Sequence, residues 1–519
     1  MQLCHIFFAT LVALAVAQDG GSDGPTTSPE ATGYSCDPST CRLPTCQCAS
    51  TSPPGGLDPA QVPQFIVFSA DDAIQSYTLD AVNQFLAQRR NPNECSPKMT
   101  YFTSLDYTNY TMVTDWYAAG NEIADHTMTH VGTPAAEEIN GNLIALNALA
   151  GIPLSSIKGF RAPFLDFNAD TLRTLHKSEF LYDSSAVASV PVTDPSTDAY
   201  WPYTLDNGLA NNCLTEGLCQ GEPRLPGLWE IPMYAFFDER GVGGRHLMDP
   251  WLEAANGNNR PDDQATLRYM QATFTDHYTN NRQPIGLYTH PIHVSMSYPG
   301  VTARPRTVEM INRFLDWAQD HDNVWIVSNE QLLDWVRNPV PASQVGSIPS
   351  FQCRPTRPDP AVPICNGVPS NQGGLLARCP FSEFPFFTCY GCPSTKPTPQ
   401  NPNPAQPDDQ EIRYRLPDDC AAAFWDPIGG VCTCTSDSCA FSDVERSIGP
   451  DGAKFSGGGV GGGPIFGGSP SGNDDNRPGD GPYLPFNGAP ATAGLPSIFL
   501  YAAHILSGAL LAGVVSILR

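Results

Sequence analysis

Short apolar runs alternate with longer amphipathic segments through the middle of the chain, from about residue 55 to residue 340. Each run is bounded by polar residues, glycine or proline, which is typical of a strand buried on both faces of a sheet. The pattern predicts strands at residues 64–68, 98–102, 122–125, 157–160, 180–182, 228–231, 285–289 and 324–327. Because the segments between them have helical periodicity, we predict an α/β domain with a parallel (β/α) barrel.

The predicted helices carry start and stop signals. We expect Thr78 to be the N-cap of the helix after the first strand, and Thr133-Pro134 to open a later helix that ends at Gly151. The apolar faces of these two helices are Leu79, Val82, Phe85 and Leu86 in the first, and Ile139, Leu143 and Leu146 in the second. Further helices are expected at about residues 263–278 and 306–318, and a long irregular insertion at residues 184–227.

Several predicted strands end in ionisable side chains. These are Asp71 and Asp72 after the first strand, His126 and, one helical turn later, His130 after the third, Arg161 after the fourth, and His290 after the seventh. The C-terminal ends of parallel strands meet at one rim of an α/β barrel, where active sites are built. We therefore expect these residues to share one site.

The chemistry of this set of residues indicates a class of reaction. One carboxylate and two neutral imidazoles are a common ligand set for a catalytic divalent metal ion. A second carboxylate, kept ionised by an arginine, can take a proton from water, and a separate histidine can protonate a departing amine. Serine and zincin hydrolases are poorer choices, because the chain contains neither GxSxG nor HExxH.

The two ends of the chain predict export and anchoring. The apolar stretch after Met1 ends in Ala15-Val16-Ala17, as in a secretory signal peptide over residues 1–17. Small residues, a short spacer and a final apolar stretch match a glycosylphosphatidylinositol (GPI) anchor signal over residues 488–519. A retained transmembrane helix is the alternative, since about 20 apolar residues span a bilayer. Both predictions place the catalytic region outside the cell, at the plasma membrane or in the cell wall.

Composition divides the rest of the chain. Of its 519 residues, 51 are proline and 45 are glycine, too many for one packed core. We expect a Cys-containing leader at residues 18–54, the catalytic domain at 55–340, a Cys-rich extension at 341–392, a Pro-rich linker at 393–415, a small Cys module at 416–445 and a Gly-rich stalk at 446–487. Because Gly and Pro tracts act as spacers, the predicted organisation is a head on a stalk.

The cysteines support an extracellular location. The chain has 17 of them, and removing Cys4 with the signal peptide leaves an even number in tight clusters, as in oxidised exported proteins. Parity suggests that Cys95 pairs with Cys353, and Cys213 is expected to pair with Cys219. The remaining clusters are Cys36, Cys41, Cys46 and Cys48; Cys365, Cys379, Cys389 and Cys392; and Cys420, Cys432, Cys434 and Cys439. Zinc binding by these clusters is the alternative, although their spacings match no CxxC…CxxC pair.

The formal net charge of −25 argues against a nucleic-acid partner, whose phosphates require a basic surface. It is compatible with a neutral polymer or with a cationic product such as an amino sugar. The simplest interpretation is that the acidity keeps an extracellular protein soluble.

The motifs at the predicted rim resemble those of a known family. Ser69-Ala70-Asp71-Asp72-Ala73, His126-Thr127-Met128-Thr129-His130, Arg161-Ala162-Pro163-Phe164 and Leu287-Tyr288-Thr289-His290 resemble, in order, the motifs of the polysaccharide deacetylases, the NodB-homology carbohydrate esterases of family four. The likeness is strongest to eukaryotic chitin deacetylase-like proteins, through the segments at residues 182–185, 201–206 and 229–232. It implies a distorted (β/α) barrel of the NodB deacetylase type.

The resemblance also implies roles for residues. Asp71 would be the general base that deprotonates the attacking water, with Arg161 orienting and ionising it, and His290 the general acid. Asp72, His126 and His130 would hold a divalent metal ion, usually Zn²⁺. A backbone amide near the Asp72–Ala73 turn would stabilise the oxyanion together with the metal.

Weaker candidates and departures accompany these roles. Candidates for a sugar-binding wall are Tyr182, Trp201 and Trp229, for which ordinary core packing is the alternative, and Asp206 is a stand-in for the carboxylate that supports the acid histidine. The family usually has Thr-Phe where this chain has Ser69-Ala70, which could loosen the packing of the base. Asp125 stands where a small polar residue is common, and could either tune His126 or face solvent.

The predicted activity is removal of N-acetyl groups from chitin or a related N-acetylglucosamine polysaccharide, by a monomer held on the membrane through a lipid anchor. Two alternatives stay open: a deacetylase of a different N-acetylated glycan, and a non-catalytic carbohydrate-binding protein of the cell wall. Asn109-Tyr110-Thr111 is a sequon that predicts N-glycosylation on an exported loop.

Overall fold

The structure is a computed structural model that describes residues 33–211, 223–252, 262–298, 304–353, 377–381, 385–388, 391–405, 425–426 and 431–432. The predicted signal peptide, stalk, anchor segment and Cys213–Cys219 bridge lie outside these residues. Of the predicted small Cys module, only the paired strands β16 (Trp425–Asp426) and β17 (Val431–Cys432) are described. Among the helices of the described ranges, none has the length and apolar character that a membrane span requires.

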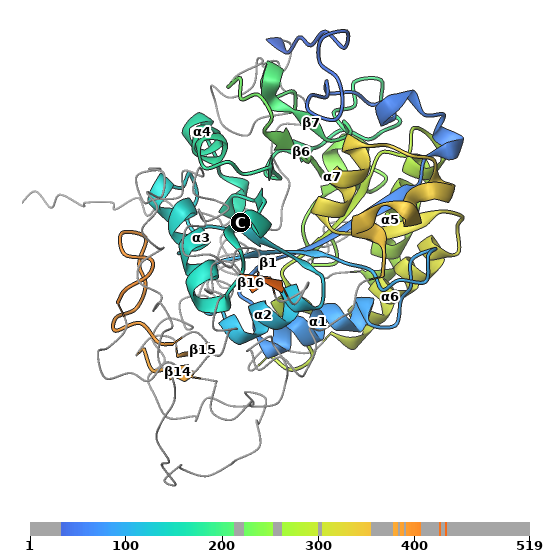
Figure 1. Ribbon diagram of the computed structural model, residues 1–519. Coiled ribbons are helices and arrows are strands. Elements are labelled where there is room, and N and C mark those ends of the chain that lie inside the picture. The colour runs from blue at the N-terminus through green and yellow to red at the C-terminus, as the bar shows by residue number, and fades with distance from the viewer. Residues whose placement is uncertain are drawn as a thin grey trace, which may run out of the picture. The chain divides into compact units, whose positions relative to one another are not determined.

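A curved, mainly parallel sheet forms the centre of the catalytic region (Figure 1). Its strands follow the order β12-β1-β2-β3-β4-β5-β8-β7, with β13 also paired to β1, and only β7 and β8 run antiparallel. The strands are β1 (Gln64–Asp72), β2 (Thr100–Thr103), β3 (Glu122–Asp125), β4 (Gly159–Phe160), β5 (Tyr182–Asp183), β7 (Tyr203–Thr204), β8 (Trp229–Glu230), β12 (Ile285–Thr289) and β13 (Val324–Val327). The prediction of a distorted (β/α) barrel is confirmed.

The long strand β1 organises the sheet. Its residues 66–70 pair with β12, residues 64–67 with β13, and residues 69–72 with β2. Because a strand has two edges and β12 overlaps both other partners in register, β13 and β2 must follow one another along the opposite edge. Within the described residues, no pairing joins β7 to β12 or β13, so the barrel is open on that side.

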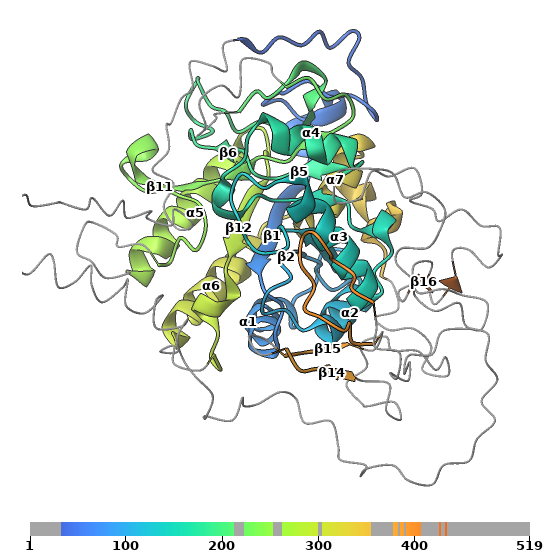
Figure 2. The same ribbon diagram turned by 90° about the vertical axis from the view of Figure 1, so that its left-hand side faces the viewer.

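Helices cover the outside of the sheet, with α2 and α3 on one side of β1 and α5 and α6 on the other (Figure 2). The helices are α1 (Ser76–Leu86), α2 (Tyr110–Ala118), α3 (Ala136–Ala150), α4 (Ala169–Lys177), α5 (Asp263–Thr279), α6 (Pro305–Gln319) and α7 (Asn329–Arg337). Short strand pairs lie outside the main sheet: β6 (Val187–Ala188) with β9 (Met233–Tyr234), β10 (Phe236–Phe237) with β11 (Arg245–His246), and β14 (Ala377–Cys379) with β15 (Phe386–Thr388).

The starts of two helices differ from the prediction. Thr78 is not the N-cap of α1: Gln75 is, and the Thr78 hydroxyl, one turn into the helix, accepts a hydrogen bond from the Gln75 backbone N–H at 2.8 Å. Helix α3 begins at Ala136 rather than at Pro134, because the Thr133 N–H is bonded to Asp166 O and its φ is 39°. The predicted end at Gly151 is confirmed, since this glycine has the left-handed φ of 67° that favours a helix C-terminus.

Alternating side chains of β1 enter two separate cores. Ile66, Phe68 and Ala70 face the helices, whereas Phe65 and Val67 face the barrel interior. Because side chains of a strand alternate between its faces, the next inward positions are Ser69 and Asp71. The interior core therefore leads directly to the predicted base.

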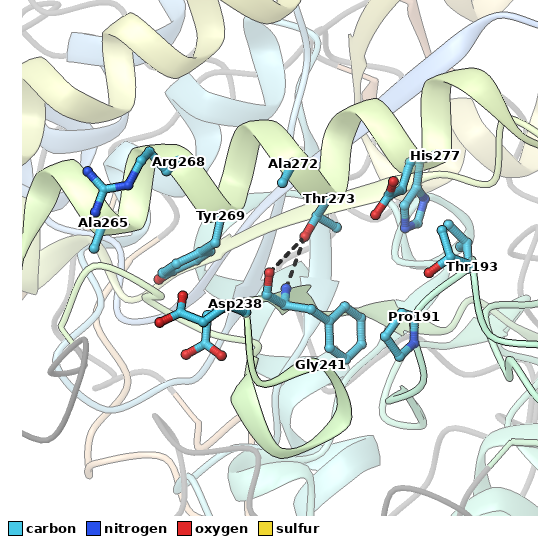
Figure 3. A pocket seen from close by; sticks show the side chains of 14 residues that line it. Pro191, Thr193, Asp238, Gly241, Ala265, Arg268, Tyr269, Ala272, Thr273 and His277 are labelled. Atoms are coloured by element: carbon cyan, nitrogen blue, oxygen red, sulfur yellow. Dashed lines mark hydrogen bonds between the residues drawn. The ribbon is translucent and has the colours of Figure 1, made fainter.

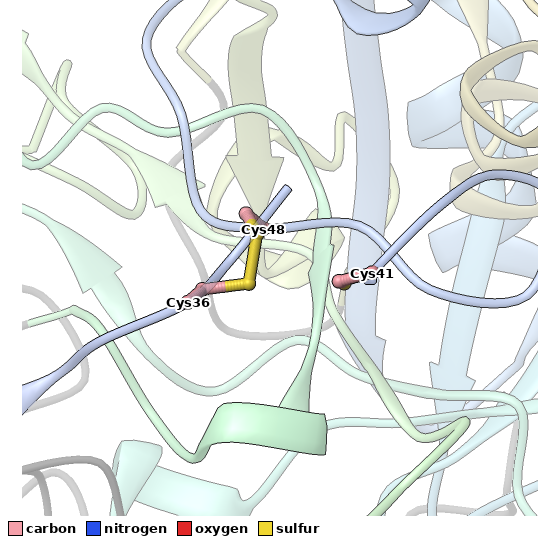
Figure 4. A group of neighbouring side chains, drawn as sticks. All are labelled: Cys36, Cys41 and Cys48. Atoms are coloured by element: carbon pink, nitrogen blue, oxygen red, sulfur yellow. A yellow bond between two sulfur atoms is a disulfide. The ribbon is translucent and has the colours of Figure 1, made fainter. Parts of the chain in front are cut away.

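Disulfides join the parts of the chain that flank the barrel. The Cys95–Cys353 bond is confirmed, and the leader cluster forms Cys36–Cys48 and Cys41–Cys46. Figure 4 shows the Cys36–Cys48 disulfide together with Cys41. Their thiols are consumed as disulfides, so zinc binding by this cluster is excluded.

The Cys-rich extension and the start of the predicted linker lie against the barrel. Cys379 is bonded to Cys392, while Cys365 and Cys389 lie outside the described residues. Phe386 of β15 packs on Tyr110 of α2, with ring centroids 5.2 Å apart, and Lys396 forms an ion pair with Asp106 at 3.0 Å.

Candidate active site

Asp71 and Arg161 form a buried ion pair at the inner face of the rim. Arg161 Nη1 lies 2.7 Å from Asp71 Oδ1, and the two side chains are 0% and 2% exposed. The same nitrogen donates to Ser69 Oγ at 2.9 Å, two residues earlier on the inward face of β1. The small Ser69 therefore does not loosen the packing around Asp71: its hydroxyl accepts from the guanidinium that pairs with Asp71.

The Arg161 guanidinium is fixed on all sides. It lies over the Phe102 ring at 4.0 Å from the centroid and over the Tyr288 ring at 5.1 Å, and Nε donates to Ser184 O at 3.0 Å. Cation–π contacts in a desolvated site favour the charged guanidinium. Because these contacts fix the guanidinium, its ion pair with Asp71 holds that carboxyl group in one position.

Asp72, His126 and His130 converge at the same rim. His130 Nε2 lies 3.1 Å and His126 Nε2 lies 3.7 Å from Asp72 Oδ1. The two histidines lie on the loop after β3. Thr127 and His130 adopt φ values of 63° and 56°, and Asp72 has φ 82° at the end of β1. Such left-handed conformations in non-glycine residues store strain and are concentrated at functional sites.

The protonation of the cluster suits metal binding. Burial lowers the pKa of His126, so its imidazole is neutral near pH 7. His126 Nδ1 lies 2.8 Å from Arg161 O, which accepts its proton and leaves Nε2 directed at Asp72. Burial by itself would raise the pKa of Asp72. The hydrogen bond and charge of His130, with the charges of His290 and His126, outweigh this effect and hold that pKa well below the usual range.

The three side chains fit a divalent metal ion. Their ligand atoms all lie within 4.8 Å of one another. Two ligands held about 2.1 Å from a tetrahedral zinc ion are about 3.4 Å apart, close to the separations of Asp72 from the two histidines. One carboxylate oxygen and two imidazole nitrogens also leave positions open for water and substrate, as in catalytic rather than structural sites.

His290 is supported by Asp249, which the sequence interpretation missed. His290 Nδ1 lies 2.6 Å from Asp249 Oδ2, and the other carboxylate oxygen accepts from Thr289 Oγ1 at 2.8 Å. A parallel bridge between Met248 and Tyr288 places Asp249 beside the end of β12. The signal was present, because Leu247 and Met248 are an apolar pair that ends in an aspartate, but the run is too short to predict a strand.

The prediction that Asp206 occupies this supporting position is wrong. Its carboxylate accepts from the backbone of Gly227 at 3.1 Å. Asp249, His290 and His293 form a second group with metal-ligating atoms, but the Asp249 oxygens already accept from His290 and Thr289. Asp249 therefore supports His290 through the Nδ1 contact.

The predicted sugar-binding wall is also wrong. Tyr182, Trp201 and Trp229 are 0–2% exposed and belong to the core inside the barrel. Trp201 packs on Trp335 with centroids 5.4 Å apart, and the Tyr182 hydroxyl donates to Glu122 at 2.6 Å. Their role is structural, the alternative that the sequence had left open.

Two further polar residues are explained by burial. Asp125 does not face solvent: it is buried and accepts from the Thr127 N–H at 2.8 Å, so it shapes the loop between the two histidines. Asn109 is 4% exposed and caps α2 through a hydrogen bond from the Thr111 N–H. The N-glycosylation that the sequon predicts stays a prediction, at a side chain that is almost fully buried.

A cavity of about 390 Å³ lies along α5, away from these residues (Figure 3). Tyr269, Thr273 and His277 of α5 form one wall, and Asp238 faces them from the loop after β10. None of the rim residues lines this cavity, so we do not assign it to the reaction.

Comparison with known proteins supports the resemblance in the motifs. No protein-family model matches the chain. The chain is 29% identical to chitin deacetylase 8 of Bombyx mori over 401 residues, which cover 75% of this chain and 97% of that protein. It is 28% identical to chitin deacetylase 1 of the same species over 389 residues, which cover 71% and 68%. The resemblance to chitin deacetylases therefore extends over most of the chain.

Solved structures include a chitin deacetylase from the fungal pathogen Colletotrichum lindemuthianum. It matches with a TM-score of 0.27 and 12% sequence identity, over 56% of this chain and 92% of the other.

Proposed function

We propose that this chain, which resembles the chitin deacetylases over most of its length, hydrolyses the N-acetyl groups of a chitin-like N-acetylglucosamine polymer. The products would be acetate and glucosamine units. One observation carries the proposal: three sets of side chains meet at one rim. They are the Asp71–Arg161 pair, the Asp72–His126–His130 group and the Asp249–His290 pair.

Asp71 is the general base. Its carboxyl group is paired with Arg161 and lies close enough to the metal-ligating group to act on His126 electrostatically. A water molecule beside it loses a proton to the carboxylate as the water oxygen attacks the acetamide carbonyl carbon. Because Arg161 and Ser69 hold the base in place, little reorganisation is needed when the proton moves.

Asp72, His126 and His130 would hold the metal ion, which we propose to be Zn²⁺. When bound, it supplies a Lewis acid that polarises the carbonyl oxygen. A backbone amide near the Asp72–Ala73 turn is the proposed second donor to the oxyanion.

His290 is the general acid. Asp249 holds Nδ1, so the proton to be given away is on Nε2, and the carboxylate stabilises the charged imidazole. As the carbon–nitrogen bond breaks, this proton passes to the departing glucosamine nitrogen. The acyl group, which now carries the oxygen of the attacking water, leaves as acetate. Asp71 then gives its proton to solvent and His290 takes one up, so both residues return to their starting states.

The setting of the reaction is extracellular. Disulfides in the described residues are typical of exported proteins. We propose that the chain is secreted, held on the membrane by a GPI anchor, and active as a monomer. A retained transmembrane helix is the alternative form of attachment.

The direct test is acetate release from chitin oligomers by the purified protein, with and without a chelator. We expect release that stops on chelation and returns when Zn²⁺ is added. A protein that binds the oligomers but releases no acetate with metal present would instead be a carbohydrate-binding protein. Release from another N-acetylated glycan but not from chitin would move the substrate to that class.

A further inference from the structure

The large apolar side chains that are exposed in the described residues are concentrated at the rim. They are Tyr107, Val131 and Met296, which are 52%, 37% and 47% exposed. Each follows the C-terminal end of a central strand, after β2, β3 and β12 respectively. Such a concentration around a catalytic centre is unlike the scattered single apolar residues of an ordinary surface, and is typical of a binding site.

Three tyrosines lie together on the side of the rim formed by β1, β2 and β12. Tyr77 is near the start of α1, and Tyr298 lies on the loop after β12, eight residues beyond His290. Their ring centroids are 4.9 Å apart. Tyr107 lies close enough to Tyr298 to act on it electrostatically, and its carbonyl accepts from the Gln75 side chain at the start of α1. We call Tyr77, Tyr107 and Tyr298 the tyrosine shelf.

The shelf is fixed to the catalytic residues through the backbone. Asp72 is followed at once by the turn that begins α1, and the Tyr101 hydroxyl donates to Ala73 O at 2.8 Å within that turn. The 3-10 turn that follows His290 (Pro291–Val294) packs against α1. The shelf therefore cannot move far from the metal-ligating group or from His290.

The chemistry of the shelf suits a neutral sugar. The rings of Tyr77 and Tyr298 are partly exposed, and in the described part of the chain no hydrogen bond to either hydroxyl is found. An aromatic face packs on the C–H face of a pyranose, while phenolic hydroxyls at its edge can bond to sugar hydroxyls. None of the three side chains carries a charge, so the shelf does not select a cationic amino sugar.

We propose that the tyrosine shelf binds the sugar unit of the polymer that adjoins the unit being deacetylated, on the His290 side of the metal-ligating group. This inference rests on the proposed function and deepens it. It assigns polymer recognition to the rim tyrosines instead of the buried Tyr182, Trp201 and Trp229. On the opposite side, Phe164 packs against His130 with centroids 4.7 Å apart.

The test compares KM and kcat for short and long chitin oligomers. Tyr107→Ala removes a half-exposed ring at little risk to folding, and we expect KM for the hexamer to rise by roughly tenfold, as loss of about 1.4 kcal/mol of binding implies. The kcat value at saturation should change little, and KM for the dimer should rise less. Tyr298→Ala should behave similarly, whereas Tyr77→Phe and Tyr298→Phe, which keep the rings, should lose less than the alanine variants.

Tyr278 supplies a matched control. It is also a partly exposed tyrosine packed on other rings, with centroids 5.6 Å from Phe274 and 5.1 Å from His321, but it lies on α5, away from the rim. Tyr278→Ala should lower the melting temperature as Tyr298→Ala does, without changing KM. If KM for the hexamer stays at the wild-type value in Tyr107→Ala and Tyr298→Ala while wild-type protein releases acetate, the shelf is not a subsite and the proposed function still stands. If the wild-type protein releases no acetate, the proposed function fails first, and binding of the hexamer to Tyr107→Ala by calorimetry decides the shelf separately.

Discussion

Strand β3 begins at Glu122 and ends at Asp125, and its two ends have different chemical surroundings. At the beginning, the Glu122 carboxyl accepts from the Tyr182 and Thr100 hydroxyls, both at 2.6 Å, and from the Glu330 N–H at 2.9 Å. At the other end, the chain turns through Asp125 into His126, whose Nε2 is directed at Asp72. One strand thus connects an enclosed carboxyl group with a group of ligand atoms that face a common centre.

The difference shows that carboxyl groups at the two ends of one strand can have opposite pKa shifts, one suited to stability and the other to metal binding. Burial, followed by the neighbouring charge of Glu330, raises the pKa of Glu122 to about 7, and the hydrogen bonds that surround it join β2, β3, β5 and α7. At the rim, by contrast, the Asp71 carboxyl group is paired with Arg161, and neighbouring histidines hold the pKa of Asp72 well below its usual range. In α/β barrels the N-terminal end of the strands serves stability and the C-terminal end serves chemistry, and both ends of β3 fit this division.

The largest expected effect is at the rim. Asp71→Asn removes the base but keeps its size, so we expect kcat for acetate release to fall by roughly a thousandfold or more. Bound metal, measured by elemental analysis, should be unchanged, because Asp71 is not a ligand in our assignment. His126→Ala should lose both activity and metal. Full turnover by Asp71→Asn would remove the proposed base.

A smaller effect is expected at the acid. Asp249→Asn removes the charge that stabilises protonated His290, and we expect kcat to fall by roughly a hundredfold. The falling alkaline limb of the pH–rate profile should move to lower pH, since the imidazole gives up its proton more easily. Asp206→Asn, at the position that the sequence had suggested, is the control and should match wild type. The opposite ranking of these two variants would exclude Asp249 from its assigned role.

At the other end of β3, the expected effect is on stability alone. A carboxyl group whose pKa is raised by folding contributes stability below its unfolded value, and this contribution is lost as pH rises through the folded value. As the pH rises from the ordinary pKa of 4.5 to the folded-state pKa of about 7, the wild-type protein should therefore lose about 3 kcal/mol of unfolding free energy through Glu122. Denaturant titrations at several pH values should show a flatter profile for Glu122→Gln, with unchanged kcat. An unchanged pH profile would mean that Glu122 is ionised in the fold at no cost.

The smallest effect distinguishes core from binding site. Tyr182→Phe removes the hydroxyl that bonds to Glu122, and should lower the unfolding free energy by about 1 kcal/mol. KM for chitin oligomers should not change, because the ring is enclosed in the barrel interior. A raised KM with normal stability would instead restore Tyr182 to the sugar-binding wall.

Much of the rim could be predicted because its signals are local. Apolar runs that end at Asp71, His126, Arg161 and His290 identify strand ends, and the C-terminal ends of parallel strands lie at one rim whatever the details of packing. The strands at 122–125, 285–289 and 324–327 were predicted with the bounds that the structure has. The Cys95–Cys353 bond followed from parity.

The errors about the aromatic wall and the carboxylate that supports His290 share a physical cause, since each concerns a residue whose surroundings come from distant parts of the chain. Trp201 and Trp229 could be placed in a wall or in a core, and only packing with Trp335 decided between them. Asp249 owes its position to a single bridge with Tyr288, which no local pattern encodes.

By itself, the sequence determined the fold class, the order of the strands along the chain and the types of side chain delivered to the rim, because alternation and periodicity are properties of neighbouring residues. Only the tertiary structure decided that Asp249 supports His290 and that Arg161 pairs with Asp71. Burial, the direction of a side chain and a hydrogen bond between Asp249 and His290 depend on atoms that lie far apart in sequence. For the same reason, the exposed tyrosines became candidates for polymer binding only when the loops that carry them were seen to meet.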